Sequence, residues 1–239
     1  MSIAEDFSKI LFREVKMRAA WLPISNHFAV GDFGLICDGV FQRMGNVSSD
    51  LQVDFQTAPG GQAAKLDFKS EQVRSVRLVG EAVVNVFPAN AVDASLRIEF
   101  ERDRSFYLKA QLTLTQMTSI FDVASRIAMA GGWNPKKYKV ISGVYSGQNC
   151  VLLSSRKGKA EIVISGKSDA LQRLEIGKAE AGLQISSTSN LGLEIVGDSG
   201  VVGLDLFSVR PSGEAELESL VPAQVSRSED WAAELEDDV

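Results

Sequence analysis

A clear period-two alternation of apolar and polar side chains runs through residues 96–115, on both sides of one polar stretch. Leu96, Ile98 and Phe100 alternate with charged residues, and after the polar stretch 102–105 the even positions are apolar again as far as Leu114. Successive side chains of a β-strand point to opposite faces, so this spacing predicts two strands with one apolar face. The polar stretch predicts a turn between them. We therefore expect a long antiparallel hairpin whose apolar face packs on the core.

Two helices are also expected. Ser2 and Glu5 have the spacing of a capping box, and apolar residues follow on one helical face at Ile3, Phe7, Ile10 and Leu11. Ser119 and Asp122 repeat the capping-box spacing before a second apolar stripe, and the glycine pair at 131–132 predicts where that helix stops.

The remaining chain is typical of strands and turns. Glycine and proline divide residues 28–88 into short β segments, and the Asp-Phe-Gly triplet at 32–34 is interpreted as a turn between strands. Further strands are predicted at 138–145, 149–155 and 159–165, joined by turns. The predicted class is α+β: a mainly antiparallel twisted sheet with long hairpins, an N-terminal helix and one internal helix.

The charge of the chain changes sign near its end. Residues 214–239 hold nine acids and one base, a net charge of −8, whereas residues 1–213 carry +2. We therefore predict a single β-rich body, 1–213, followed by an acidic tail, 214–239, with a short helix in which Trp231 and Leu235 lie one turn apart. Such a tail either masks a surface meant for anions or only keeps the protein in solution.

Composition limits the cellular setting. The chain has no apolar run long enough for a transmembrane helix, and its start does not resemble a secretory signal. Its two cysteines, Cys37 and Cys150, cannot form a disulfide framework. A reducing, cytoplasmic location is expected.

Residues that could support catalysis are sparse. The one histidine, His27, is the only side chain through which a serine triad could be drawn, and it is interpreted as a loop residue. One histidine and two separated cysteines cannot make a closed zinc site, and no phosphate-binding glycine loop occurs. Glu99, Glu101 and Asp103 are expected on a solvated face. We predict no enzyme, no cofactor and no metal.

Basic residues gather in the third quarter of the chain, beside Trp133 and Tyr138. Bases next to aromatic residues are typical of a contact with an anionic membrane surface, although a solvated mixed-charge face has the same composition. No nucleic-acid motif accompanies them, so nucleic acid is not an expected partner. The predicted membrane-binding residues are Lys136, Lys137, Lys139, Arg156, Lys157 and Lys159.

The order of these strands resembles that of a known family. The segments that carry the resemblance are Tyr138-Lys-Val-Ile-Ser-Gly-Val-Tyr145, Cys150-Val-Leu-Leu-Ser-Ser, Lys157-Gly-Lys-Ala-Glu-Ile and Gly200-Val-Val-Gly-Leu-Asp-Leu-Phe-Ser-Val209. Together with the opening helix and the length of the chain, their layout is similar to the pore-forming module of gasdermins.

The resemblance implies a mechanism. Gasdermins stay soluble and autoinhibited until an activating protease removes a carboxy-terminal segment. The freed module then binds acidic lipid, forms a homo-oligomer and inserts hairpins that make a pore and lead to cell death. For this chain it implies membrane hairpins at 96–115 and 138–165, and autoinhibition by the tail through Trp231 and Leu235.

Two functions are therefore expected. The first is a non-enzymatic, gasdermin-like pore-forming protein, autoinhibited in the cytoplasm by its C-terminal tail and acting on membranes after release. The alternative is a soluble β-rich scaffold or binding module that assembles with itself or a protein partner through its sheet edges.

Overall fold

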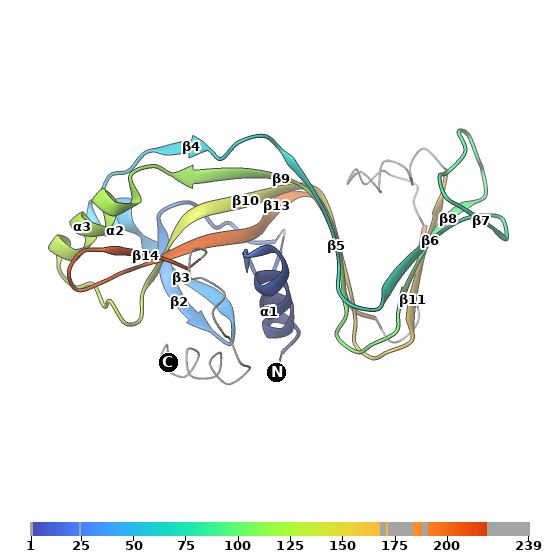
Figure 1. The fold of residues 1–239 in the computed structure, drawn as a ribbon, viewed down its shortest axis with the longest axis horizontal. Coiled ribbons are helices and arrows are strands. Elements are labelled where there is room, and N and C mark those ends of the chain that lie inside the picture. Colours follow the sequence, from blue (N-terminus) through green and yellow to red (C-terminus); the bar gives the residue numbers. More distant parts are fainter. Residues whose placement is uncertain (1, 24, 168–170, 172–183, 188–190, 219–239) are drawn as a thin grey trace. The chain divides into compact units, whose positions relative to one another are not determined.

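The chain passes repeatedly between two compact units in the computed structural model (Figure 1). The structure describes residues 2–23, 25–167, 171, 184–187 and 191–218. Unit 1 comprises residues 1–62, 113–146 and 201–239, and unit 2 comprises 63–112 and 147–200. Three long strands each contain a crossing point between the units: β9 (Phe106–Met117), β10 (Lys139–Ser155) and β13 (Leu191–Val209).

Unit 1 opens with the predicted amphipathic helix, α1 (Ile3–Val15). The predicted capping box is present, because the Ser2 hydroxyl accepts from the Glu5 amide at 3.1 Å and the Glu5 carboxylate accepts from the Ser2 amide at 3.4 Å. Phe7 and Leu11 on its apolar face are fully buried. A cap of this kind satisfies amides that the first helical turn leaves without partners, which is why the helix begins at Ile3.

A sheet runs through unit 1 in the order β1-β13-β10-β2-β3. Its further strands are β1 (Arg18–Ala19), β2 (Asp32–Cys37) and β3 (Val40–Asn46). At its margins β14 (Ala215–Leu217) pairs with β13, and β4 (Thr57–Pro59) pairs with β9. The sequence did not predict α2 (Val47–Leu51), which begins where the Asn46 side chain accepts from the Ser48 amide at 3.0 Å.

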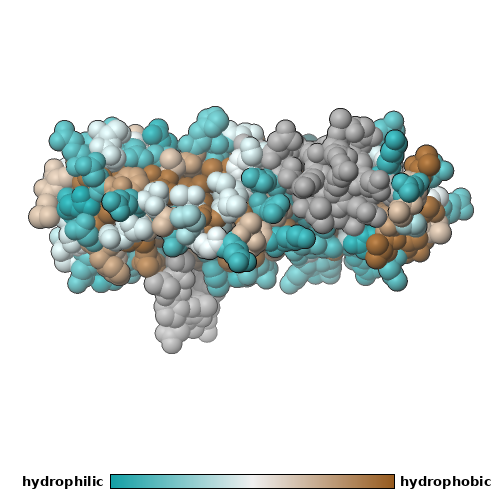
Figure 2. Space-filling model, turned by 90° about the horizontal axis from the view of Figure 1, so that it is seen from above, coloured by the Kyte–Doolittle hydropathy of each residue, from teal (hydrophilic) through white to brown (hydrophobic). Residues whose placement is uncertain are grey.

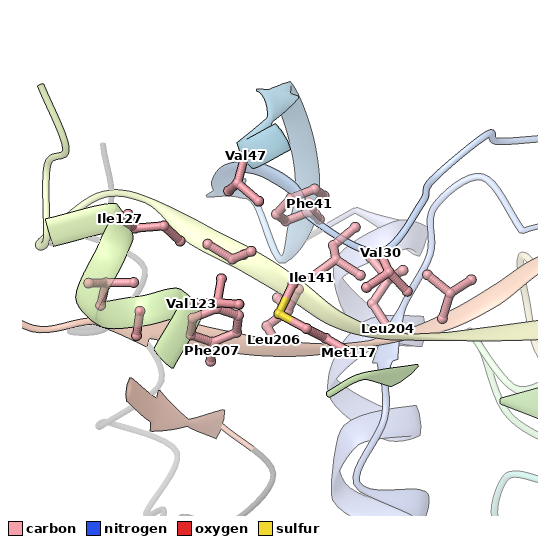
Figure 3. Packing of buried hydrophobic residues seen from close by; sticks show 14 of the residues in the cluster. Val30, Phe41, Val47, Met117, Val123, Ile127, Ile141, Leu204, Leu206 and Phe207 are labelled. Carbon is pink, nitrogen blue, oxygen red and sulfur yellow. The ribbon is translucent and has the colours of Figure 1, made fainter. Parts of the chain in front are cut away.

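The core of unit 1 lies between this sheet and helix α3 (Ile120–Ala130), as Figure 3 shows. Val123 and Ile127 from α3 pack with Phe207 and Leu206 from β13, and Ile141 from β10 lies at the centre of the cluster. Each of these side chains is at most 2% exposed. The helix is held to the sheet by the burial of apolar surface, which contributes about 25 cal/mol of free energy per Å² removed from water.

Two local predictions in unit 1 were wrong. Ser119 does not cap α3 with its side chain, because its backbone is left-handed (φ 56°) and its hydroxyl makes no cap hydrogen bond. The chain enters this helix directly from the β4–β9 ladder, where the Thr118 amide donates to the Gln56 carbonyl. The triplet 32–34 is not a turn but the start of β2, fixed by buried Asp32, whose carboxylate accepts from the Ala29 amide at 2.9 Å.

Unit 2 consists of two layers of strands. One layer contains β5 (Ala64–Lys69) paired with β9, then β9 with β10 and β10 with β13. The other has the order β12-β11-β8-β6-β7. Its bounds are β12 (Gln184–Ser187), β11 (Ala160–Gly166), β8 (Ala94–Phe100), β6 (Val73–Val79) and β7 (Ala82–Val84). Tyr107 and Leu153 from the first layer pack with Phe100 and Ile162 from the second, so the two layers share one core.

The antiparallel α+β class is confirmed, but the strands at 96–115 are not paired as a hairpin. Both edges of β8 are occupied, one by β6 and the other by β11, so no edge remains for β9. Residues 101–105 instead carry the chain from one layer to the other. Alternation of side chains describes a single strand and does not select its partner, which explains why the sequence pattern suggested a hairpin.

The two strands predicted at 138–145 and 149–155 are one continuous strand, β10. The predicted turn at 146–148 lies within it, and the Ser146 carbonyl accepts from the Thr113 hydroxyl at 3.3 Å. The Ser-Gly-Gln sequence at 146–148 suggests a turn, but glycine also tolerates extended backbone within a strand. Among the described residues, no helix is long and apolar enough to cross a bilayer.

Candidate functional site

The two layers of unit 2 have matching strand orders. Reading across the first layer gives β5-β9-β10-β13, and reading across the second gives β6-β8-β11-β12. The chain joins β5 to β6, β8 to β9, β10 to β11 and β12 to β13, so each strand continues into the strand at the same position in the other layer. Unit 2 is therefore a four-stranded sheet folded over on itself, with β7 added at one edge (Figure 1).

Three described connections form the line along which the sheet folds. These fold-line arches are residues 70–72, 101–105 and 156–159, while the fourth connection, 188–190, lies outside the described residues. The arches are bonded to one another. The Phe106 amide donates to the Ser70 hydroxyl at 2.8 Å, and the Glu101 amide donates to the Gln72 carbonyl at 3.2 Å.

Ser155 joins the second arch to the third. Its buried hydroxyl accepts from the Ser105 amide at 3.1 Å and donates to the Arg102 carbonyl at 2.8 Å. The Gly158 amide donates to the Asp103 carboxylate. A Cβ at Gly158 would come within 2.7 Å of the Glu101 carbonyl oxygen, so this close approach of two arches requires glycine.

The alternation of residues 96–114 does not match how unit 2 is packed. In β8 the even residues Ile98 and Phe100 face the core between the layers, but in β9 the odd residue Tyr107 does so. The inward face therefore changes parity at the arch. Phe106 and Leu108 are buried on the opposite side of β9, and neither belongs to the cluster between the layers. The even apolar residues of β8 and β9 would share one face, interrupted by Arg102 and Arg104, only if the two strands were straight.

Because the inward face changes parity, β9 buries odd-numbered side chains that the sequence pattern predicts to be solvated. The Lys109 side chain is only 9% exposed and pairs with Asp67 at 3.2 Å. Tyr107 lies beside it, with the Lys109 ammonium 5.9 Å from the ring centroid. Burying a lysine carries a desolvation cost even when it is paired.

The connection between β6 and β8 exposes apolar side chains. Val83, Val86 and Val92 are 71%, 73% and 78% exposed, whereas Phe87 is buried in the core between the layers. Figure 2 shows the corresponding hydrophobic patch at the end of unit 2 that carries β7, on the right. We call residues 80–93 the apolar loop. Single exposed valines are ordinary, but three in one loop make an apolar surface of the kind that can contact a protein partner or a membrane.

The predicted membrane-binding residues divide between the two units. Lys136 and Lys137 are exposed in unit 1, and Arg156, Lys157 and Lys159 are exposed in the third arch of unit 2. Lys139 differs, since its ammonium lies 3.5 Å from the Glu218 carboxylate and 3.1 Å from the Ser208 hydroxyl. A role for these residues at a membrane stays a prediction.

The start of the predicted tail is bound to unit 1. Glu218 pairs with Arg18 at 2.9 Å as well as with Lys139, and the three side chains are between 11% and 20% exposed. Glu216 pairs with Arg210 at 3.0 Å, which lowers the pKa of that carboxyl. The sequence does not indicate that these pairs form, because acidic and basic residues are mixed in the segments that contain them. Trp231 and Leu235 lie outside the described residues.

A second polar pair lies inside unit 1. The Tyr145 hydroxyl donates to the Asp205 carboxylate at 3.0 Å, linking β10 to β13. Burial raises the pKa of Asp205, although the Tyr145 hydrogen bond opposes this, and burial together with the Asp205 charge raises the pKa of Tyr145 to about 12. A Cβ at Gly143 would lie 2.9 Å from the same carboxylate, so the pair fits against bare backbone.

Groups that could support other chemistry are divided between the two units. His27 is exposed in unit 1. Glu99 and Glu101 line an open cleft of about 510 Å³ in unit 2, where Glu101 pairs with Arg74 at 3.4 Å. Within the part of the chain that the structure describes, no group of three or more histidine, cysteine or acidic residues is arranged to hold a metal ion.

Comparisons with known proteins give structural matches only. No family model matches the sequence. No curated protein matches it. The fold is similar to a bacterial gasdermin from Bradyrhizobium tropiciagri, with 13% identity and a TM-score of 0.39, covering 89% of this chain and 90% of that chain. It is also similar to the gasdermin A3 membrane pore, with 12% identity and a TM-score of 0.31, covering 94% of this chain and 98% of that chain.

Proposed function

We propose that this protein is a non-enzymatic pore former that inserts hairpins into anionic membranes when the folded-over sheet of unit 2 straightens. In this proposal β5 with β6 and β8 with β9 become the two arms of one hairpin. β10 with β11 and β12 with β13 become the arms of a second. The folded form is the cytoplasmic one, and copies of the chain assemble side by side at the membrane.

The observation that carries the proposal is the matching strand order of the two layers. Straightening the arches leaves every strand beside the neighbours it already has. Strand lengths add support. β5 has six residues and β6 and β8 have seven each, which is fewer than the about 9–11 residues of a membrane-spanning strand. Joined end to end they exceed that length.

The alternation of residues 96–114 also supports the straight form. A membrane-spanning strand needs one apolar face toward lipid and one polar face away from it. A straight β8–β9 arm would place Ile98, Phe100 and Leu108 on one face and Lys109 on the other, with Arg102 and Arg104 of the arch as the charged interruption of the apolar face. In the folded form the even residues of β8 face the core between the layers, whereas the even residues of β9 are buried on the opposite side of their strand.

Release of dye from vesicles tests the proposal. The chain lacking residues 219–239 should permeabilise vesicles that contain anionic lipid, and vesicles of neutral lipid should leak far less. The apolar loop would form the tip of the first hairpin. Val83→Asp with Val86→Asp should therefore reduce leakage by at least about tenfold, because the tip must cross the hydrocarbon core during insertion and a charge at the membrane centre costs about 2.5–3.5 kcal/mol.

Two controls make this test specific. Met44 is also an exposed apolar residue, 56% exposed, but it lies in unit 1, and Met44→Asp should leave leakage unchanged. Urea unfolding should show that all variants are folded. A folded protein that never permeabilises anionic vesicles would rule out pore formation and would favour a β-rich scaffold or binding module.

A further inference from the structure

The backbone at the fold line is left-handed in each of the three described arches. Gln72, Arg104 and Lys159 have φ angles of 62°, 53° and 60°. None of them is glycine, asparagine or aspartate, the residues that adopt this conformation at low cost. In the third arch a glycine is adjacent, at Gly158, but the left-handed position belongs to Lys159.

A second unfavourable feature lies beside the arches. Ser154 is completely buried, and its hydroxyl has no hydrogen-bond partner among the residues that the structure describes. Leaving a buried hydroxyl without a partner costs free energy that exposure to water would recover. The hydrogen bonds of Ser70 and Ser155 across the arches act in the opposite direction and hold the fold line closed.

We infer that the fold line is a strained hinge, in which left-handed residues at 72, 104 and 159 oppose the folded form of unit 2 and set how readily the sheet straightens. Straightening returns these residues to extended backbone, which any amino acid adopts without this strain. The link to pore formation rests on the function proposed above. The strain itself belongs to unit 2 whether or not a membrane is present.

Gln72 gives the cleanest test, because its side chain is exposed, whereas Lys159 carries a charge that could itself contact lipid. Gly, Asn, Gln and Val at this position form a series of decreasing tolerance for left-handed backbone. Val also favours a strand, and Gly disfavours one, so both effects act in the same direction. This order follows neither side-chain size nor polarity.

Leakage from anionic vesicles should follow the series in the chain lacking residues 219–239. Gln72→Gly should slow leakage by roughly tenfold, Gln72→Asn should slow it less, and Gln72→Val should accelerate it by at least about threefold. Gln52 is a matched control, because it is an exposed glutamine with φ 56° that ends α2 in unit 1. Gln52→Gly should leave the leakage rate within about twofold of the parent chain.

Amide hydrogen exchange in solution provides a readout that needs no membrane. The Glu101 and Phe106 amides bond across the arches, so their exchange reports local opening of the fold line. Gln72→Val should accelerate their exchange severalfold, and Gln72→Gly should not accelerate it.

The two readouts separate the hinge from the pore. Ordered leakage rates and faster exchange in Gln72→Val support both. Leakage that is equal for all four residues, with unchanged exchange, overturns the hinge and leaves pore formation standing. If the parent chain never permeabilises vesicles but exchange still follows the prediction, the pore fails and the strained hinge remains. If leakage and exchange are both negative, both ideas fail.

Discussion

At the scale of single residues, Asp205 links the pH of the solution to the stability of unit 1. Burial raises the pKa of this carboxyl in the folded protein, so the folded state binds its proton more tightly than the unfolded state does. The group therefore costs no stability at pH values below its unfolded pKa. Stability is lost as the pH rises from the pKa of Asp205 in the unfolded state through its pKa in the folded state.

This sign leads to a prediction for Asp205→Asn, which removes the charge but keeps an acceptor for the Tyr145 hydroxyl. The variant should be more stable than the wild type at pH 7, and the advantage should shrink as the pH falls through the pKa of Asp205. Urea midpoints at pH 7 and near pH 4 measure this. An advantage that stayed constant over that range would show that ionisation of Asp205 is not its cause.

Phe100 tests the core between the layers of unit 2. It is 1% exposed, and Phe100→Asp should lower the free energy of unfolding by about 3–5 kcal/mol, through lost packing and a buried charge without a partner. Glu99→Ala on the opposite face of β8 is the control and should change it by less than about 0.5 kcal/mol. Equal effects of the two substitutions would show that the core does not pack on the face of β8 that carries Phe100.

Which residues could be predicted depended on how local their partners are. The Ser2–Glu5 cap was predicted correctly, because both partners lie within one helical turn. The same spacing at Ser119 failed, because an incoming β ladder sets the backbone there. The pairing of Glu218 with Arg18 joins residues 200 positions apart, and no pattern in the sequence relates them.

At the scale of elements, Glu218 is predicted to hold the end of β14 to unit 1. Glu218→Gln preserves the shape of the side chain but removes the carboxylate that pairs with the mostly buried Arg18 and Lys139. The free energy of unfolding should fall by about 2–3 kcal/mol. Urea denaturation measures the change.

Glu214 provides the comparison for that prediction. It contacts Arg210 at 3.8 Å in a pair whose side chains are more than half exposed, so Glu214→Gln should change stability by less than about 0.5 kcal/mol. A loss in Glu218→Gln no larger than that in Glu214→Gln would show that the buried pair does not fasten β14.

The strands themselves were largely predictable, and their partners were not. Alternation placed β8 and β9 correctly, since it depends only on which faces of a strand are apolar. It could not show that the chain changes layers at 101–105, because pairing depends on β6 and β11, whose positions are set by the rest of unit 2. The three valines of the apolar loop were visible in the sequence, but only the structure shows that Phe87 is buried while they are exposed.

At the scale of the whole molecule, the role of the tail can be separated into charge and contact. Removing residues 219–239 takes away six acids and one base and changes the net charge from −6 to −1. The shortened chain should bind anionic vesicles more tightly at low salt. This gain should fade with added salt, because exposed charges are screened beyond about 10 Å at 0.1 M.

Trp231→Ala with Leu235→Ala in the full chain tests the predicted contact by itself, since it leaves the charge unchanged. If the tail covers a membrane-binding surface, the variant should reproduce part of the increase in vesicle binding, because an aromatic anchor often dominates such a contact. Vesicle co-sedimentation measures both variants. A folded chain without residues 219–239 that sediments with no vesicle at any salt concentration would mean that the tail only keeps the protein in solution.

The matching strand orders in unit 2 also determine where the protein can tolerate natural variation. If the sheet straightens as proposed, a substitution that disturbs strand pairing would damage the folded and the straight sheet alike, because both use the same neighbouring strands. A substitution in the arches would change only the balance between the two forms. Under the proposed function, selection for earlier or later straightening would act on a few positions near 72, 104 and 159 and leave the strands unchanged. The arches would then set the balance between the two forms, while the strand pairing stays the same in both.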